Sequence, residues 1–366
     1  MRILILNQIL YTADNNTIPV VSSIKDTMIY GMCLGFVNTG HTVTLAASEE
    51  YKPQSPETYD FTVRFFSSDI PRIFAPSILP FSSELYRFIK REQANFDLVI
   101  SSEVFSFQSL FAAILCPRKT LIWQGETAHP KKFHQLPSKI WYRMIAPLFL
   151  RKVRQIIPRS KRACDFTKSY LHNVTDTVLD HGINVDKFTF SSEKTRTIIS
   201  SSQLIARKNI NGIIRVFSAF TQMEGYEDIR LLIAGRGDQR PMLESLAAEL
   251  GVREKVEFLG FLPQTELNQY IKTSYCFLVN TRQDLNMVSI PEAVVSGTPI
   301  LTNTQPASAG YIRANRLGIV KDHWNEYDLK KIIDENPVFV QNCIAYRDNL
   351  TNTHIARTFL EIYRNK

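Results

Sequence analysis

The sequence of 366 residues lacks any apolar run of the roughly 18 residues that a membrane-spanning helix requires. Its first ten residues are mostly apolar, but the polar Asn7 and Gln8 interrupt them and they contain a single Arg. This pattern predicts a first β-strand rather than a secretory signal peptide. We therefore expect a cytoplasmic protein.

Cysteines in paired spacing and clusters of histidine are also lacking. The five cysteines, at positions 33, 116, 164, 276 and 343, are far apart, and most stand in apolar surroundings. Reduced, buried thiols are the simple interpretation. The seven histidines are scattered along the chain, so the sequence shows no group of metal ligands.

Acidic residues are absent from residues 127–164, where ten Lys or Arg occur. In the centre of this stretch, bulky apolar residues and basic residues alternate at roughly helical spacing. A basic amphipathic helix with Trp and Tyr suits an anionic membrane surface, and residues 131–162 are a candidate for that contact. The alternative is an ordinary helix that packs its apolar face on a sheet. No RNA- or DNA-binding motif accompanies the charge, so nucleic acid is not an expected partner.

The length of the chain is too great for one ordinary core and suggests two domains. Strand and helix patterns alternate from the start, with a strand at 2–6, a helix at 24–37 and a strand at 41–47. This opening is typical of the first crossover of a doubly wound parallel sheet. Residues 52–82 contain several Pro and Ser and are expected to form a loop with short structure.

The most informative stretch is residues 281–301. The apolar residues 276–279 predict a buried strand, followed by a polar loop, a helix that begins at Ser289 and a further strand after Gly297. In an open parallel sheet, ligands bind at the loop that leaves the carboxyl end of a strand, and the N–H groups of the next helix suit a phosphate. Asp284 and Glu292 flank this site, and their carboxylates can accept hydrogen bonds from sugar hydroxyls. The alternative is that Ser289 and Glu292 form a capping box and that Asp284 is a solvated loop acid.

An acid, seven residues, Glu-Ala and then Gly-Thr-Pro-Ile together resemble the carboxyl-terminal signature of glycosyltransferase family 4. Members of that family are retaining enzymes of the GT-B fold, an α/β architecture of two Rossmann-like, doubly wound parallel-sheet domains that face each other across a cleft. The family usually has Glu where this chain has Asp284, and Phe-Gly where it has Asn286-Met287.

The resemblance covers residues 178–335 well and 1–50 weakly. It implies an acceptor-binding domain at 1–188, a nucleotide-sugar-binding domain at 189–350 and a C-terminal helix at 351–366 that packs back on the first domain. By the same resemblance, Lys208, Asp284 and Glu292 are the catalytic residues, because a cation stabilises the departing diphosphate and the two acids hold the sugars. The other donor-binding residues implied are Gln203, Arg207, Gly235, Gly237, Leu259, Asn286, Met287 and Val288.

The acceptor side is less sharply defined. Glu126 and His129 follow the strand predicted at 120–123, near the family's acceptor pocket, and either could point into the cleft; a surface loop is the alternative. Residues 1–188 contain 22 Lys+Arg and 16 Asp+Glu, a net charge of +6, whereas the remainder carries +2. A basic first domain suits an acceptor linked to a phosphate-bearing lipid and an enzyme peripheral to the inner face of the membrane.

The function that the resemblance implies is the transfer, with retention, of a hexose-type sugar from a UDP- or GDP-sugar to a saccharide or lipid-linked acceptor. No metal or other cofactor is expected. The pathway would be the synthesis of a cell-surface polysaccharide such as capsule, O-antigen or lipopolysaccharide. Two alternatives remain open: a GT-B epimerase, which would form its product without an acceptor, and a non-catalytic partner that binds nucleotide sugars.

Overall fold

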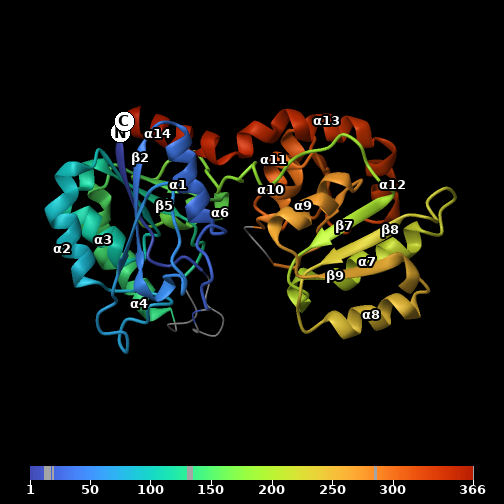
Figure 1. The fold of residues 1–366 in the computed structure, drawn as a ribbon, viewed down its shortest axis with the longest axis horizontal. Helices are drawn as coiled ribbons and strands as arrows, with labels where there is room; N and C mark the ends of the chain where they lie inside the picture. The colour runs from blue at the N-terminus through green and yellow to red at the C-terminus, as the bar shows by residue number, and fades with distance from the viewer. Residues whose placement is uncertain (12–17, 19, 130–134, 284–286, 366) are drawn as a thin grey trace. The chain divides into compact units, whose positions relative to one another are not determined.

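In the computed structural model the chain divides into two compact units (Figure 1). Unit 1 comprises Met1–Gly182 and Asn352–Lys366, and unit 2 comprises Ile183–Thr351. The structure describes the whole chain except residues 12–17, 19, 130–134, 284–286 and 366. The sequence analysis had placed the boundaries after residues 188 and 350.

Unit 1 is built on a parallel sheet with the strand order β3-β2-β1-β4-β5-β6 among the described residues. Alternate residues of the central strand enter different cores: Ile3 and Ile5 pack with helices α1 and α14, whereas Leu4 and Leu6 pack with α2 and α3. A strand covered on both faces explains the continuous apolar run at the start of the chain. The strands are β1 Arg2–Leu6, β2 Thr42–Ser48, β3 Thr62–Phe66, β4 Leu98–Ser102, β5 Thr120–Gln124 and β6 Gln155–Pro158. The helices are α1 Met28–Asn38, α2 Ser83–Glu92, α3 Phe107–Leu115, α4 Leu136–Ile140, α5 Ala146–Phe149, α6 Lys161–Lys168 and α14 Asn352–Arg364, with a π-helical turn, η5 Trp141–Ile145, between α4 and α5.

Unit 2 repeats this plan, with the strand order β12-β11-β10-β7-β8-β9 among the residues described. Ile198 of its central strand faces one core and Ile199 faces the other. The strands are β7 Thr197–Ser201, β8 Arg230–Ala234, β9 Val256–Gly260, β10 Phe277–Leu278, β11 Ile300–Thr302 and β12 Gly318–Val320. The helices are α7 Ile210–Phe220, α8 Arg240–Glu249, α9 Gln264–Thr273, α10 Ser289–Val295, α11 Ala309–Ala314, α12 Glu326–Asp334 and α13 Asn336–Tyr346.

The last helix, α14, returns to unit 1 and packs against α1. The ring of Phe359 lies 6.1 Å from that of Phe36, between centroids, and 5.8 Å from that of Trp123. The helices approach closely because Gly35 has no side chain: a Cβ there would lie 2.2 Å from the carbonyl oxygen of Asn352. Gly35 therefore allows α14 to pack closely against α1 of unit 1.

The structure corrects the predicted elements in three places. Strands β3 and β6 lie in segments that were expected to be loop and helix. Both are edge strands, β3 is only half-buried, and β6 ends in Pro158, so neither carries the apolar run of a central strand. Helix α1 begins at Met28 rather than Ile24, because the Thr27 side chain accepts a hydrogen bond from the N–H of Tyr30 and caps the helix.

The cysteines agree with the prediction of buried thiols: all five are buried and none forms a disulfide. A search of the described residues finds no helix whose length and apolar character would let it cross a bilayer.

Candidate functional site

The sheet of unit 2 reverses its direction of growth at β7. The chain adds β8 and β9 on one side of this strand and then places β10 on the other side, parallel to it. The loops that leave β7 and β10 therefore diverge and leave a crevice at the carboxyl ends of the two strands, which is where open α/β sheets bind ligands.

Hydrogen bonds join the two loops at this crevice. The backbone carbonyl oxygen of Arg207 accepts from the backbone N–H of Arg282 at 2.8 Å and from the Thr281 hydroxyl at 3.1 Å. Arg207 belongs to a 3₁₀ turn, Ala206–Lys208, that is closed by Asn209 in a left-handed conformation with φ of 54°. The loop after β7 thus brings Arg207 and Lys208 to the base of the 281–288 loop.

Three of the predicted donor-site side chains, Gln203, Arg207 and Lys208, lie on the loop between β7 and α7. Arg207 and Gln203 are exposed, whereas Lys208 is buried. The Arg207 guanidinium donates to the side-chain oxygen of Gln203 at 3.5 Å, so a cation lies beside Gln203.

Glu292 lies on the buried side of α10. Its carboxylate accepts a hydrogen bond from the Gln264 side chain on α9 at 3.2 Å, and Lys187 donates to the same Gln264 amide at 3.3 Å. Burial raises the pKa of Glu292 to about 7, although Gln264 and Lys187 favour its ionised form. A carboxyl group with such a pKa changes charge near neutral pH.

The capping-box alternative for Glu292 does not hold. Helix α10 begins at Ser289, so Ser289 is its first residue and Val288 is its N-cap. Val288 offers no side-chain cap, and the partner of the Glu292 carboxylate is Gln264 rather than the helix terminus. Asp284 and Asn286, which complete the predicted set in this loop, lie outside the described residues.

The two glycines after β8 bring backbones together. A Cβ on Gly235 would lie 1.8 Å from the carbonyl oxygen of Ser202, and one on Gly237 would lie 2.2 Å from that of Leu204. Gly235 also has a φ of 135°, which few other residues adopt. The two glycines thus allow the loop after β8 to pack directly against the loop after β7, which contains Gln203.

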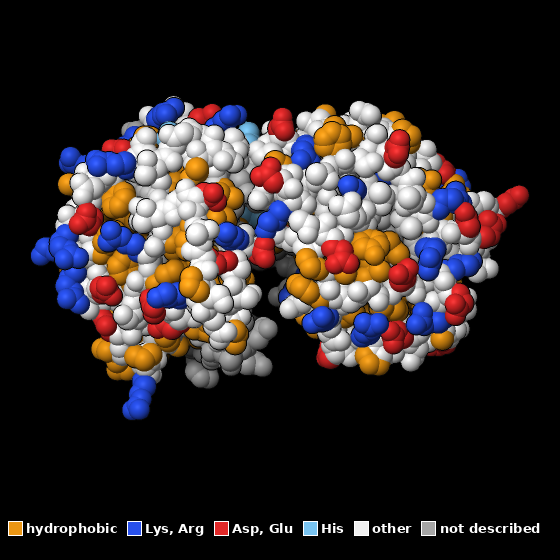
Figure 2. All heavy atoms as spheres, viewed as in Figure 1, with side chains coloured by type: hydrophobic (Ala, Val, Ile, Leu, Met, Phe, Trp, Pro, Cys, Tyr) orange, Lys and Arg blue, Asp and Glu red, His pale blue; other side chains and the backbone are white. Residues whose placement is uncertain are grey.

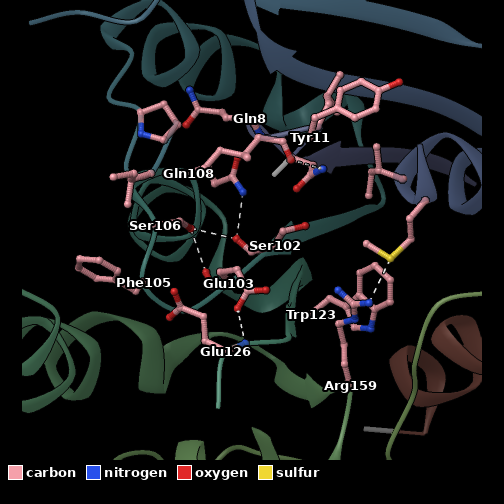
Figure 3. Close-up of a pocket in the computed structure, with 17 residues that line it drawn as sticks. Gln8, Tyr11, Ser102, Glu103, Phe105, Ser106, Gln108, Trp123, Glu126 and Arg159 are labelled. Atoms are coloured by element: carbon pink, nitrogen blue, oxygen red, sulfur yellow. Dashed lines mark hydrogen bonds between the residues drawn. The ribbon is translucent and has the colours of Figure 1, made fainter. Parts of the chain in front are cut away.

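Unit 1 has an equivalent crevice, because β1 is flanked by β2 and β4. A cavity of ≈ 290 Å³ lies here, at the carboxyl ends of β1, β4 and β5 (Figure 3). Its lining includes Gln8, Glu103, Phe105, Glu126 and Arg159.

Glu103 is the best-connected carboxylate of this cavity. It has a left-handed backbone with φ of 66°, and its carboxylate accepts hydrogen bonds from the N–H groups of Gly125 and Glu126, each at 3.0 Å. Gly125 permits this approach, because a Cβ there would lie 2.9 Å from the Glu103 carboxylate. The loop after β4 is therefore locked to the loop after β5.

The second carboxyl group, Glu126, has a weaker set of partners. The Tyr142 hydroxyl donates to it at 3.4 Å. Burial and the nearby charge of Glu103 raise the pKa of Glu126 well above its usual range. Burial also raises the pKa of Glu103, but its backbone donors and Arg159 favour the ionised form. Of the two carboxyl groups, Glu126 is therefore the one whose neutral form the surroundings favour more strongly.

Comparison with known proteins connects this geometry to a family. Residues 184–336 match the family model described as Glycosyl transferases group 1. The second unit belongs to this glycosyltransferase family. Because the match spans nearly all of unit 2, the crevice at β7 and β10 lies within the glycosyltransferase domain.

A curated relative of the chain is alpha-monoglucosyldiacylglycerol synthase of Streptococcus pneumoniae, which is 24% identical over 215 residues. The match covers 54% of this chain and 47% of that enzyme, so the chain spans about half the length of that relative.

Two solved structures have the same fold over the whole chain. A glycosyltransferase from Rickettsia africae has a TM-score of 0.69 at 14% identity and covers 100% of this chain and 98% of its own. HepE of Anabaena, in complex with UDP, has a TM-score of 0.67 at 13% identity and covers both chains completely. Together with the two doubly wound parallel sheets, these likenesses confirm the predicted GT-B fold class.

Within the glycosyltransferase domain, the predicted donor-binding residues occupy several environments. Met287 is buried in a core of unit 2, whereas the Val288 side chain is exposed. Leu259 lies in the edge strand β9 and is half-buried.

On the acceptor side, the structure separates the two predicted residues. Glu126 lines the cavity of unit 1. His129 is absent from the described lining, and its ring nitrogens are hydrogen-bonded with Ser138 and Tyr170, each at 2.9 Å. His129 packs there among the rings of Tyr142, Phe166 and Tyr170.

Glu103, Arg159 and Gln8 line the cavity but were not predicted as site residues. Glu103 follows β4 at its carboxyl end, where an acid is a usable signal. Arg159 follows β6, a strand that was not predicted. Its guanidinium lies 3.1 Å from the Asp180 carboxylate and over the ring of Trp123, at 4.6 Å from the centroid. Only the fold brings Arg159 beside Glu103.

Proposed function

We propose that the protein is a retaining glycosyltransferase of family 4 that transfers a hexose-type sugar from a nucleotide sugar to a saccharide or lipid-linked acceptor. The observation that carries this proposal is the crevice of the glycosyltransferase domain, where the hydrogen-bonded loops hold Arg207 and Lys208 at the base of the 281–288 loop. Two cations at this position suit the diphosphate of a nucleotide sugar.

The roles follow from the chemistry of the leaving group. Lys208 and Arg207 stabilise the negative charge that develops on the diphosphate as the glycosidic bond breaks. Glu292 accepts hydrogen bonds from the ribose hydroxyls, and Asp284 accepts them from the transferred sugar. The backbone N–H groups of Met287 and Val288 complete the diphosphate contacts. The leaving phosphate itself takes the proton of the acceptor hydroxyl, and the enzyme contributes position and charge without a metal.

The donor and acceptor classes are supported by the proteins that this chain resembles. HepE of Anabaena has been solved with UDP, and the pneumococcal relative is named for a glucosylated diacylglycerol. We therefore propose a UDP-hexose as donor and a lipid-linked or saccharide acceptor, in the synthesis of a cell-surface glycolipid or polysaccharide.

The first test is the thermal unfolding of the full chain with UDP, GDP or ADP. At tenfold excess over Kd, a nucleotide that binds should stabilise the native state by about 1.4 kcal/mol. Donor turnover is then followed with and without an acceptor. Transfer that requires an acceptor supports the proposal, product formation without one indicates an epimerase, and nucleotide binding without turnover indicates a non-catalytic partner.

We also infer that unit 1 docks on an anionic membrane through residues 136–152, a surface we call the basic ridge. Trp141, Tyr142, Ala146 and Leu150 point into the core of unit 1. Four apolar side chains point outward at intervals of four residues and are 46% to 67% exposed: Leu136, Ile140, Met144 and Leu148.

The winding of this segment explains why an interval of four keeps these side chains in line. In an α-helix a step of four residues overshoots a full turn, whereas in the wider π-helical turn η5 it falls short of one. The two angular deviations cancel along the segment, so the four exposed apolar side chains form one apolar stripe. The exposed basic residues Arg143, Arg151 and Lys152 accompany this stripe. Such a combination is the pattern of an interfacial amphipathic helix.

Charge alone does not single out the basic ridge. On the face drawn in Figure 2, Lys and Arg side chains also gather at the edge of unit 1 where Figure 1 places α2. The exposed Lys90 and Arg91 belong to that helix, but its apolar side chains Leu85, Phe88 and Ile89 are buried. Helix α2 is therefore a matched control with charge but without an outward apolar stripe.

Vesicle sedimentation tests this inference. Met144→Ser with Leu148→Ser should reduce binding to phosphatidylglycerol vesicles at least tenfold, because apolar area and charge both contribute to interfacial binding. Lys90→Ser with Arg91→Ser should reduce it less than threefold. An equal loss in both variants, or no preference of the native protein for anionic lipid, would contradict docking through the ridge.

A further inference from the structure

The cavity of unit 1 is lined by groups that favour an uncharged ligand. Among its described lining residues are two carboxyl groups, Glu103 and Glu126, and a single cation, Arg159. The guanidinium of Arg159 is already paired with Asp180 at 3.1 Å and covers the Trp123 ring. A phosphate in this cavity would meet a carboxylate and no uncommitted cation, so electrostatics oppose it.

Gln8 is the second, independent sign of a ligand. Its side chain lines the cavity, is 1% exposed and forms no hydrogen bond with the described part of the chain through either its amide nitrogen or its amide oxygen. Buried amides nearly always have partners, and an unpaired one lowers stability. A hydroxyl group can serve either atom of this amide, because it both donates and accepts.

The backbone of Gln8 is held in place by Gln108, which also lines the cavity. The side chain of Gln108 on α3 accepts from the backbone N–H of Gln8 at 2.8 Å and donates to the carbonyl oxygen of Ser102 at 2.9 Å. Gln108 thereby links the ends of β1 and β4. Figure 3 shows Gln8 and Gln108 on one side of the cavity and Glu103 and Glu126 on another.

We propose that this cavity is the acceptor subsite and that it binds an uncharged polyhydroxylated ring, such as the sugar or polyol head of a glycolipid, through Gln8, Glu103 and Glu126. Its identification as the acceptor subsite rests on the proposed function. The carboxyl groups of Glu103 and Glu126 can accept hydrogen bonds from ring hydroxyls, and the amide of Gln8 can both donate and accept. The ring of Phe105 contributes an apolar wall.

The size of the cavity agrees with a single ring. A volume of ≈ 290 Å³ is close to the lower end of the range of about 300–1,000 Å³ that is usual for small-molecule sites, so the cavity has room for one sugar or polyol ring. Since the lining opposes a phosphate, we expect any phosphate attached to the acceptor to lie outside the cavity.

The test is saturation-transfer NMR on the full-length protein with matched probes. Methyl α-glucoside, methyl α-galactoside and methyl α-mannoside are compared with the corresponding α-hexose 1-phosphates, which differ only in the charged substituent. At least one neutral glycoside should bind, at least tenfold more tightly than its phosphate. UDP binding, measured separately by thermal shift, shows whether the donor half of the proposed function is intact.

Variants then connect binding to the named side chains. Gln8→Leu and Glu126→Leu should weaken glycoside binding at least fivefold and leave UDP binding unchanged. Glu126→Gln should retain binding, because the amide has nearly the same shape and offers both an acceptor and a donor to a ring hydroxyl. This rescue would not occur if Glu126 acted only through its charge. Gln93→Leu, in unit 1 but outside the cavity lining, is the control and should have no effect.

Three results would overturn the proposal. The hexose phosphates could bind as well as the neutral glycosides, or no glycoside could bind to a protein that binds UDP, and in both cases the proposed glycosyltransferase function would stand. Alternatively, the Gln8 and Glu126 variants could weaken UDP-hexose binding and leave glycoside binding intact. The cavity would then hold the sugar of the donor.

Discussion

The side chain of Glu292 combines two demands that oppose each other. Burial of its carboxyl group favours the neutral form and raises its pKa to about 7, despite the hydrogen bond from Gln264. The proposed contact with ribose hydroxyls favours the ionised form, because a carboxylate accepts hydrogen bonds more strongly. Nucleotide binding and proton release should therefore be coupled at this residue.

This coupling predicts how UDP affinity depends on pH. Ionisation of Glu292 should make UDP binding about tenfold tighter at pH 8 than at pH 6, because a group of pKa about 7 goes from mostly protonated to mostly ionised over this range. Calorimetric titration across the range measures the effect. The diphosphate also titrates here, so Glu292→Gln provides the reference. Identical pH profiles for the two proteins would rule out the role.

The same residue affects stability in the opposite direction. The folded pKa lies above the usual value for Glu, so between about pH 4.5 and 7 the folded state binds more protons than the unfolded state. The contribution of Glu292 is thus fully present below this window and is lost as the pH rises through it. In the free protein, Glu292→Gln should remove this part of the decline in stability, as measured by urea unfolding.

Lys208 is the residue on which the proposed chemistry depends most directly. Lys208→Met should lower kcat by about 10²–10³-fold, because it removes a donor aimed at the developing charge of the leaving group. Steady-state kinetics and thermal unfolding are measured together, since Lys208 is buried. Lys331→Met, at an exposed position of α12 in the same unit, is the control. Unchanged kcat in a folded Lys208→Met protein would contradict the role.

At the scale of the element, helix α14 depends on a close backbone approach. Gly35→Ala would place a Cβ 2.2 Å from the carbonyl oxygen of Asn352, and neither α1 nor α14 can give way without moving its backbone. We expect a loss of about 1–3 kcal/mol in unfolding free energy and faster proteolysis of the C-terminal helix. Gly310→Ala in α11 meets nothing within 4 Å and should be nearly neutral. Equal effects of the two substitutions would contradict this account.

The helices and strands also differ in how clearly the sequence predicts them. The central strands β1 and β8 contain continuous apolar runs because helices cover both faces of their sheets, and β1 was predicted with its observed bounds. The edge strands β3 and β6 were missed, since a half-exposed strand needs few apolar residues. The π-helical turn η5 could not be foreseen either, because its winding depends on packing around Trp141 and Tyr142.

At the scale of the whole molecule, charge should govern membrane association. The chain has a formal net charge of +8 at pH 7, and the contact proposed for the basic ridge combines charge with apolar area. Binding to anionic vesicles should therefore fall as salt rises from 0.05 to about 0.5 M, because the Debye length shortens over this range. It should not vanish, since the apolar stripe is insensitive to screening. Complete loss at high salt would contradict insertion of the stripe, and no change would contradict a role for charge.

The doubly wound plan of both units and the candidate donor residues of unit 2 are predictable from the amino-acid sequence alone. These features are local: apolar runs mark buried strands, and Lys208, Gly235 and Glu292 lie in motifs whose members are close together in the chain. A short segment carries such a signal whatever the remaining residues do.

The surroundings of these residues, in contrast, depend on the tertiary structure. It placed Gln264 rather than Ser289 against Glu292, turned His129 into an aromatic cluster, and assembled the cavity of unit 1 from Gln8, Glu103, Glu126 and Arg159. Each of these four residues follows a different strand of the parallel sheet. The carboxyl ends of those strands come together only when the sheet has formed. Burial and charge pairing depend on neighbours that are distant in sequence. The raised pKa values of Glu126 and Glu292 therefore follow from the fold and not from the local sequence.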